Sequence, residues 1–203
     1  MEHTENTILL RGELLELPRF SHENHGKQFY RFTLAVPRLS GTVDALPVIV
    51  ESRILQNIDL SGGDMLRVEG QIRSHNLRQD GARRLLIFVF AAVIAAEEGP
   101  PANEVTLCGP LCRMPVYRRT PLGREICDVM LVVPRAFRRA DYLPCILWGR
   151  TAQQIASCST SDVVQVYGRL QSRSYTKQTD QGAVERVAYE ISALRAEIWE
   201  DNQ

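Results

Sequence analysis

The sequence predicts an all-β protein built from two similar small barrels, and two observations lead to this prediction. When the chain is shifted by 97 residues, Asn6–Arg53 lies over Asn103–Arg150 without a gap. In addition, short stretches of alternating apolar residues are separated by turn signals at regular intervals, which is typical of an all-β sandwich or barrel. A period of this length is too long for a solenoid unit, so the repeat indicates a duplicated domain.

Glycine and proline residues carry the most informative matches, because they constrain backbone geometry rather than composition. We expect two domains of about 100 residues each, covering residues 1–98 and 99–203. The segment Glu97–Ala102 (EEGPPA) would join them as a short, stiff spacer. The matched pairs are Gly12/Gly109, Gly26/Gly123, Pro18/Pro115, Pro37/Pro134 and Pro47/Pro144.

The second half is expected to contain five strands and one helix. Gly109 should bend the first strand sharply, and the turn Thr120–Gly123 (TPLG) should open a hairpin. Arg150–Cys158 contains helix formers and is too polar for a buried strand, so it predicts a short helix between strands three and four. Thr176–Gly182 is expected as a flexible polar loop, and helix formers in Ala193–Glu200 leave a helical end to the last segment open. The expected strands are Val105–Tyr117, Ile126–Val133, Tyr142–Trp148, Val163–Ser174 and Glu185–Trp199.

The first half follows the same plan. Its helix is expected at Ser52–Asn57, and its loops at His22–Gly26 and Leu77–Gly81. A single helix after the third strand of so small an all-β domain predicts a five-stranded Greek-key barrel of the OB type. The alternation alone also allows an immunoglobulin-like sandwich. The expected strands are Thr7–Leu17, Gln28–Val36, Leu46–Glu51, Met65–Arg73 and Arg84–Ala95.

The net charge is zero, but the charges are unevenly distributed. Residues 113–173 carry 10 basic and 4 acidic side chains. This surplus indicates an anionic partner for the second half, although basic surface loops alone also produce one. No apolar run approaches the ~18 residues needed to span a bilayer, so we expect no membrane contact. The polar, acidic start MEHTENT contains no secretory signal, which makes the cytoplasm the default location.

The sequence gives little support to catalysis or metal binding. The five cysteines form no CxxC pair and the four histidines all lie in the first half, so free buried thiols are expected. Ser61–Asp64 (SGGD) is expected as a turn, and no HExxH or GxSxG motif occurs. Asp44 and Asp141 occupy matching sites before an apolar strand, which predicts turn formers. We therefore expect no enzyme, no cofactor and no metal site.

Five stretches of the second half resemble the bacterial single-stranded DNA-binding protein family, in its order and at its spacing over essentially the whole repeat. The first half keeps weaker forms of the same motifs, NTILLRG, LAVPR and VEGQIRS. The two-domain layout is similar to the tandem-OB members of this family and, more distantly, to primosomal replication protein N. The five stretches are Asn103–Gly109 (NxVxLxG), Arg118–Arg124 (RxTPLGR), Leu131–Arg135 (LVVPR), Ile146–Ala152 (ILWGRTA) and Val166–Tyr175 (VYGRLQSRSY).

The resemblance implies sequence-nonspecific binding and protection of single-stranded DNA in replication, recombination or repair, in the cytoplasm at the bacterial nucleoid. It also implies a homodimer, so that four OB folds act together. Two other readings remain open, a tandem-OB scaffold that binds proteins and an OB protein that binds RNA. The sequence stops at Glu200–Gln203, directly after the last expected strand, so recruitment of replication proteins through an acidic tail is not expected.

Aromatic residues of the second half are the candidate base contacts. Stacking on an aromatic side chain contributes roughly 1–3 kcal/mol per base and tolerates any base. If Leu143, Cys145 and Leu147 face the core, strand alternation leaves Tyr142 and Trp148 together on the outside. By the resemblance, Trp148, Tyr142 and Tyr175 match positions of stacking aromatics. Packing within the barrel is the alternative for each. Tyr117, Phe137 and Trp199 are weaker candidates; Tyr117 lies beside the basic loop, and packing is favoured for Trp199.

Cations of the second half are the candidate phosphate contacts, and nearly all are arginine, which binds phosphate at two points and stacks on bases. In the first half, Glu51 replaces Trp148 and Ala45 replaces Tyr142, while Phe29 aligns with Ile126 at an expected core position. The first barrel is therefore expected to be a supporting fold with a weakened groove. The candidate cations are Arg113, Arg118, Arg119, Arg124, Arg135, Arg138, Arg139, Arg150, Arg169, Arg173 and Lys177.

Overall fold

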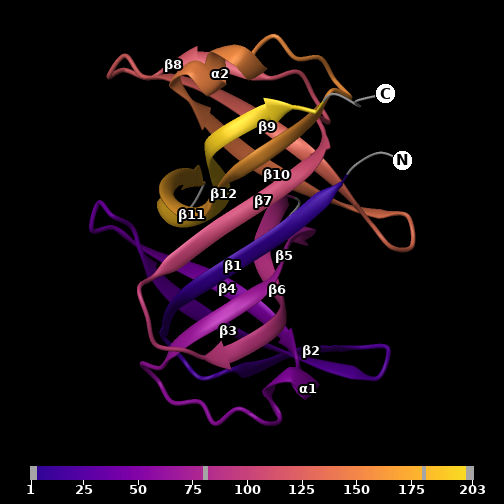
Figure 1. Cartoon of the computed structure of the whole chain (residues 1–203), viewed down its shortest axis with the longest axis vertical. Helices are drawn as coiled ribbons and strands as arrows, with labels where there is room; N and C mark the ends of the chain where they lie inside the picture. Colours follow the sequence, from indigo (N-terminus) through magenta and orange to yellow (C-terminus); the bar gives the residue numbers. More distant parts are fainter. Residues whose placement is uncertain (1–3, 80–81, 180–181, 200–203) are drawn as a thin grey trace.

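The computed structural model describes residues 4–79, 82–179 and 182–199, most of which lie in strands (Figure 1). The first half contains one short helix, which follows its third long strand as predicted. Its elements are β1 (Glu5–Leu14), β2 (Arg19–Asn24), β3 (Lys27–Pro37), β4 (Val43–Glu51), α1 (Ser52–Leu55), β5 (Met65–Gln79) and β6 (Ala82–Ala96).

The second half repeats this order, and its helix again lies at the predicted place. The elements are β7 (Ala102–Pro110), β8 (Val116–Arg119), β9 (Glu125–Arg135), β10 (Arg139–Trp148), α2 (Gly149–Ile155), β11 (Val163–Thr179) and β12 (Gly182–Ile198). No helix in these described residues is long and apolar enough to cross a membrane.

Each half closes into a barrel of the predicted Greek-key type. In the first, β1 pairs with β5 and β3, β5 with β6, and β3 with β4, all antiparallel. A parallel pairing of β4 with β6, at Val48 and Val89, completes the circuit. The second barrel has the matching parallel pair at Cys145 and Ile191, and a bridge between Leu111 and Leu131 closes it. This closure excludes the immunoglobulin-like sandwich.

The glycines of the repeat lie where strands approach each other most closely. A Cβ on Gly109 would stand 2.5 Å from the carbonyl oxygen of Val132, and one on Gly168 would stand 2.3 Å from that of Ser192. The register of β11 and β12 shifts between Tyr167 and Gly168, so the bulge lies in the fourth strand of the barrel rather than at Gly109. These contacts explain why glycine recurs at both places in the chain.

Three expectations about the strands were wrong. The first strand of each barrel is broken in two, because Pro18 and Pro115 lie in the breaks and cannot donate to a ladder. The loops expected at Leu77–Gly81 and Thr176–Gly182 are strand at their described residues, since pairing continues to Gln79/Ala82 and Thr179/Gly182. Residues 80–81 and 180–181 lie outside the described residues. The loop expected at His22–Gly26 is strand as far as Asn24, where β2 ends. The expected strand at Glu185–Trp199 is confirmed to Ile198, and residues 200–203 again lie outside the description.

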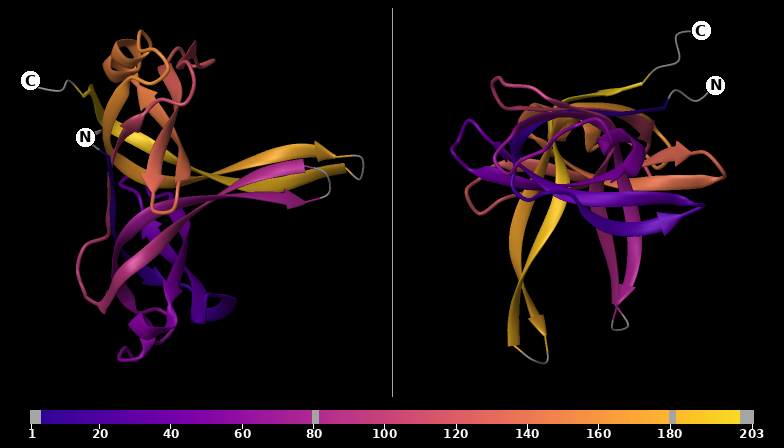
Figure 2. Two further views of the ribbon diagram at one scale, coloured as in Figure 1. Left: turned by 90° about the vertical axis from the view of Figure 1, so that its right-hand side faces the viewer. Right: turned by 90° about the horizontal axis from the view of Figure 1, so that it is seen from below.

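The extended β5–β6 and β11–β12 hairpins leave their barrels on the same side of the molecule (Figure 2). A hydrogen bond connects the two hairpins: Arg84 Nη2, close to the outer end of the β5–β6 hairpin, donates to the carbonyl oxygen of Val187 at 3.4 Å. In the outer part of each hairpin, polar and apolar residues do not alternate regularly, because a two-stranded ribbon has no core on either face. This explains why the sequence pattern predicted loops.

The two barrels are joined edge to edge by β1 and β7. Their antiparallel pairing runs from Glu5/Cys108 to Arg11/Ala102 and merges both halves into one 12-stranded sheet (Figure 1). Two fully buried carboxylates form hydrogen bonds across the junction between the barrels. Asp44 Oδ1 accepts from Ser172 N at 2.7 Å, and Asp141 Oδ1 accepts from Ser74 N at 2.6 Å. The prediction that both aspartates form turns was therefore wrong; each binds the opposite barrel.

The cysteines are free, as expected, but one of them is not buried. Cys108, Cys127, Cys145 and Cys158 are buried, whereas Cys112 is exposed. Burial raises the pKa of the Cys108 and Cys127 thiols to about 11.

Candidate nucleic-acid interface

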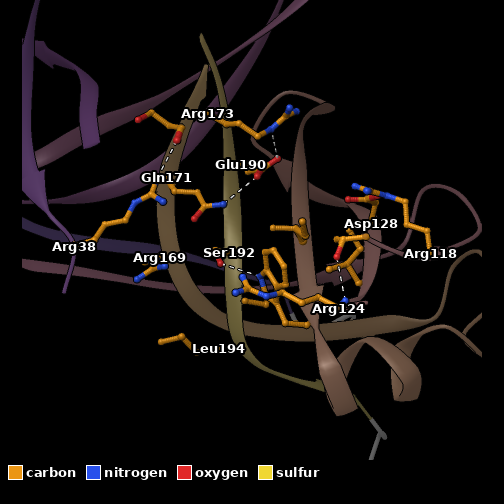
Figure 3. Close-up of a pocket in the computed structure, with 16 residues that line it drawn as sticks. Arg38, Arg118, Arg124, Asp128, Arg169, Gln171, Arg173, Glu190, Ser192 and Leu194 are labelled. Carbon is orange, nitrogen blue, oxygen red and sulfur yellow. Dashed lines mark hydrogen bonds and ion pairs between the residues drawn. The ribbon is translucent and has the colours of Figure 1, made fainter. Parts of the chain in front are cut away.

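A groove of about 850 Å³ lies on the outer face of the second barrel, and we call it the second-barrel groove (Figure 3). Strands β8 to β12 supply most of its wall, and Arg38 enters it from the first barrel. Its lining residues are Arg38, Arg118, Thr120, Arg124, Ile126, Asp128, Ile146, Trp148, Arg169, Gln171, Ser172, Arg173, Glu190, Ser192, Ala193 and Leu194.

Trp148 lies in this groove at the end of β10. Leu143, Cys145 and Leu147 are buried in the core, so the predicted core face of the strand is confirmed. Trp148 is 37% exposed on the opposite face. Its Nε1 donates to Ser192 Oγ at 3.2 Å, which fixes the edge of the indole ring. A ring held in this way loses little conformational freedom when a base stacks on it.

The other five aromatic candidates, Tyr142, Tyr175, Tyr117, Phe137 and Trp199, lie outside the groove. Tyr142 shares the outer face of β10 and is exposed, but its backbone N donates to Ser74 Oγ at 2.7 Å, at the junction with the first barrel. Tyr175 lies on the β11–β12 hairpin, where the Arg173 guanidinium stands 5.8 Å from its ring centroid. Tyr117 is on β8, and a hydrogen bond to Glu125 raises its pKa.

Four of the candidate arginines line the groove, namely Arg118, Arg124, Arg169 and Arg173. Arg118 Nε donates to Asp128 Oδ2 at 2.7 Å, and Arg173 Nε lies 3.7 Å from Glu190 Oε2 (Figure 3). Arg169 differs from these two. Its Nε is buried and has no hydrogen-bond partner within the described part of the chain, and no ion pair there offsets its charge.

The remaining candidate cations are not brought into this groove. Arg119 pairs with Glu125 at 2.9 Å, while Arg135 and Arg139 line hollows of the first barrel. The other candidates, which lie on loops, on α2 and on the β11–β12 hairpin, are Arg113, Arg138, Arg150 and Lys177. The predicted cation cluster is therefore divided between the two barrels.

Arg38 is the groove residue that sequence reasoning missed, because it belongs to the first half. Its Nε and Nη2 donate to Asp44 at 2.7 and 2.6 Å, and Nη2 also donates to the Ser172 carbonyl oxygen at 2.9 Å. Burial alone would raise the pKa of Asp44, but hydrogen bonds from Arg38 and Ser172 outweigh it and hold that pKa below its ordinary value. The repeated motif LAVPR/LVVPR marks Arg38 and Arg135 as equivalent residues. The motif alone does not show that each arginine pairs with a buried aspartate at the junction of the two barrels.

The first barrel differs at the matching place, as expected from its sequence. Glu51 stands where the second barrel has Trp148, and its carboxylate is paired with Lys27 at 3.3 Å and Arg53 at 3.0 Å. The expectation that Phe29 is a core residue was confirmed, since its side chain is buried like that of Ile126 at the matching position. Phe29 also lines a hollow of the first barrel.

The fold and the groove define the class of this protein: a tandem OB-fold protein with a basic, tryptophan-containing groove. The description "Single-strand binding protein family" applies to the family whose profile matches residues 102–198. Single-stranded DNA-binding protein B of Bacillus subtilis (strain 168) is 39% identical over 83 residues, and the match covers 37% of this chain and 74% of that protein. Single-stranded DNA-binding protein 1 of Staphylococcus aureus (strain COL) is 37% identical over 83 residues, and the match spans 50% of its length. The chain belongs to the single-strand binding protein family.

Among solved structures, the wild-type single-stranded DNA binding protein from Thermus aquaticus is similar to the whole chain. It has a TM-score of 0.80 at 24% sequence identity, and the match covers 98% of this chain and 95% of that one. A deletion mutant of the same protein gives a TM-score of 0.78. This structural similarity covers both barrels, whereas the family profile matches the second barrel alone.

Proposed function

We propose that this protein binds single-stranded DNA without sequence preference through the second-barrel groove, and protects it during replication, recombination or repair. The observation that carries the proposal is the arrangement around Trp148. An indole ring fixed by Ser192 shares one groove with five arginines, and Arg169 forms no ion pair within the described part of the chain. A single strand presents bases and phosphates, and the groove offers an aromatic ring for the bases beside cations for the phosphates.

The same chemistry explains why no sequence preference is expected. Every base has a π-face, so stacking on Trp148 does not distinguish bases. The groove arginines bind phosphates, which are the same in every sequence. Asp128 and Glu190 each offset the charge of one groove arginine, Arg118 and Arg173. The lining still carries five arginines against these two acids, so its balance is positive.

The strand is proposed to continue beyond the groove over the remaining candidates. Tyr175 and Lys177 extend the path along the β11–β12 hairpin, and Tyr142 extends it toward the first barrel. Arg150 on α2 and the loop residue Arg138 would contribute weaker electrostatic contacts. Tyr117 and Arg119, which interact with Glu125, would contribute least.

A homodimer in the bacterial cytoplasm, at the nucleoid, completes the proposal. Two copies of a chain with two OB folds would present four folds to one strand. Light scattering tests the assembly, because a dimer has twice the chain mass of 23.0 kDa. A particle of single-chain mass at working concentrations would contradict it.

Fluorescence anisotropy of labelled oligo(dT) and oligo(U) at low and at high salt tests the binding itself. Tight binding of oligo(dT) that weakens with salt supports the proposal, with a slope of log K against log salt of about −0.7 per phosphate contacted. Stronger binding of oligo(U) would assign the groove to RNA instead. Absence of binding to either oligonucleotide at low salt would leave the protein-scaffold reading.

A further inference from the structure

Glu190 is an acidic residue inside a groove that is otherwise suited to phosphates. It lies on β12, lines the second-barrel groove, and its side chain is only 16% exposed (Figure 3). A carboxylate repels phosphates, so its place among arginines needs a separate explanation. The other acid of the groove, Asp128, has one, because Arg118 Nε donates to it at 2.7 Å.

The carboxylate of Glu190 is held at one oxygen and open at the other. Gln171, its strand partner on β11, donates from Nε2 to Oε1 at 3.0 Å. Oε2 lies 3.7 Å from Arg173 Nε, which is too long for a hydrogen bond. The Arg173 side chain is itself 58% exposed, and ion pairs at such exposed positions contribute little. Oε2 is therefore an acceptor that a ligand in the groove can use.

The charge of Glu190 acts on arginines at both sides of the groove. A hydrogen bond to Asp44 raises the pKa of Arg38, one to Asp128 raises that of Arg118, and the charge of Glu190 adds to both increases. Figure 3 shows Arg38 and Arg118 on opposite sides of Glu190. A strand whose phosphates follow these arginines therefore passes over the carboxylate.

Glu190 also lies one step along β12 from the residue that fixes the indole ring. That residue is Ser192, whose Oγ accepts from Trp148 Nε1 at 3.2 Å. Residues two apart in a strand point to the same face at a spacing of about 7 Å, and both of these line the groove. Ser192 and its strand partner Ile146 are nearly buried and form the floor between the indole edge and the carboxylate. A base stacked on the ring extends over this floor with its edge toward Oε2.

An ionised carboxylate only accepts hydrogen bonds, so it distinguishes bases by the donors at their edges. Cytosine presents the amino group N4–H₂, whereas thymine and uracil present the carbonyl oxygen O4 at the same place. The ring N–H of thymine or uracil lies between two carbonyl oxygens, which repel a carboxylate. Glu190 is therefore suited to cytosine and poorly suited to thymine or uracil.

We propose that Glu190 is a base-contacting residue: its carboxylate accepts a hydrogen bond from the amino group of the base stacked on Trp148, so that cytosine is preferred there over thymine or uracil. The inference rests on the proposed function for the stacked base. It adds a base preference at one place to binding that is otherwise independent of sequence. The first barrel has no such acceptor, because Gln171 pairs with Glu190 whereas the matching Arg73 pairs with Phe88.

Oligo(dC) and oligo(dU) of equal length test this preference, because cytosine and uracil differ only along the edge that carries the amino group or O4. Each competes with labelled oligo(dT) in an anisotropy titration at low salt and neutral pH. The unsubstituted chain should bind oligo(dC) roughly three- to tenfold more tightly, as expected for one added hydrogen bond. Equal binding, or tighter binding of oligo(dU), would overturn the inference without the need for a variant.

Glu190→Gln then shows whether Glu190 causes the preference. Glutamine has nearly the same shape, but its amide both donates and accepts, so the ratio of the two affinities should fall to about one. Removing the negative charge should strengthen the binding of both oligonucleotides. A purely electrostatic or structural role would change both affinities alike and leave their ratio unchanged. Asp128→Asn is the matched control, since it removes the same charge from the same groove and should keep the ratio of the unsubstituted chain.

The outcomes separate this inference from the proposed function. A ratio that survives Glu190→Gln, or one that is lost equally in Asp128→Asn, would overturn the inference, while salt-sensitive binding with quenched tryptophan fluorescence would still support the proposed function. If neither oligonucleotide binds the unsubstituted chain at low salt, the proposed function fails and the inference fails with it.

Discussion

Asp44 of the first barrel accepts two hydrogen bonds from Ser172 of the second, from its backbone N at 2.7 Å and from its hydroxyl at 2.9 Å. Asp141 and Ser74 make the reciprocal contact in the opposite direction. With the β1–β7 pairing between them, these contacts make the junction two-fold in character. The two barrels are therefore held in a fixed relation by buried, hydrogen-bonded carboxylates as well as by strand pairing.

Replacing Asp44 by Ala should destabilise the folded chain strongly. The side chain is 1% exposed and neutralises Arg38, so its loss leaves a partly buried guanidinium without a counter-charge. Breaking a buried pair costs about 3–5 kcal/mol. Urea unfolding measures the change. Glu197→Gln is the control, because the Arg195–Glu197 pair is well exposed and should matter by about 1 kcal/mol or less. Equal effects of the two variants would contradict the role given to Asp44.

The same carboxylate should make stability depend on pH. Its pKa is lowered in the folded state from the ordinary value of 3.8, so the folded chain holds the proton less tightly than the unfolded chain does. The stabilisation is present above that ordinary value and is lost as pH falls through the lowered folded value. Urea midpoints measured between about pH 6 and pH 3 should fall less steeply for Asp44→Asn than for the unsubstituted chain. Parallel curves would contradict this assignment.

Trp148→Ala should weaken oligo(dT) binding by roughly tenfold or more, because one stacked base is lost. Phe137→Ala is the matched control. Phe137 is 95% exposed at the loop between β9 and β10 and does not line the groove. Anisotropy titrations at one salt concentration compare them. If both substitutions weaken binding equally, stacking is not localised at Trp148.

Arg169→Gln should reduce the salt dependence of binding. Losing one phosphate contact should lower the slope of log K against log salt by about 0.7. Arg195→Gln serves as the control, because Arg195 stacks 4.4 Å from the Tyr167 ring centroid and lies outside the groove. An unchanged slope for Arg169→Gln would show that Arg169 does not contact a phosphate.

Cys112 should be the thiol that reacts in the native chain. It is exposed, while Cys108, Cys127, Cys145 and Cys158 are buried, and burial raises the pKa of each buried thiol. The thiolate is the reactive form, so these four thiols should not react in the folded chain. Titration with an aromatic disulfide reagent should count one thiol in buffer and five in denaturant. Loss of that one thiol in Cys112→Ser confirms the site.

Much of the fold could be predicted from the sequence because it depends on local signals. Recurring glycines such as Gly12 and Gly109 mark close strand contacts, and polar helix formers after the third strand mark α2. The outward face of Trp148 followed from the alternation of Leu143, Cys145 and Leu147. Each of these depends on neighbours within one element.

The features that could not be predicted depend on contacts between elements far apart in the chain. Asp44 resembled a turn former until Ser172 was brought beside it from the other barrel. The side chains of Phe88 and Phe90 could not be assigned to a face, because Leu85–Ala96 is almost uniformly apolar and shows no alternation. Arg38 lines a groove to which its own barrel contributes little else.

The most direct test of the central proposal is the fluorescence of Trp148 in a Trp199→Phe variant, which leaves Trp148 as the single tryptophan of the chain. Titration with oligo(dT) at low salt should quench this signal, and added salt should restore it as the strand dissociates. A strand that binds without changing Trp148 fluorescence, or no binding at all, would contradict the assignment of the second-barrel groove.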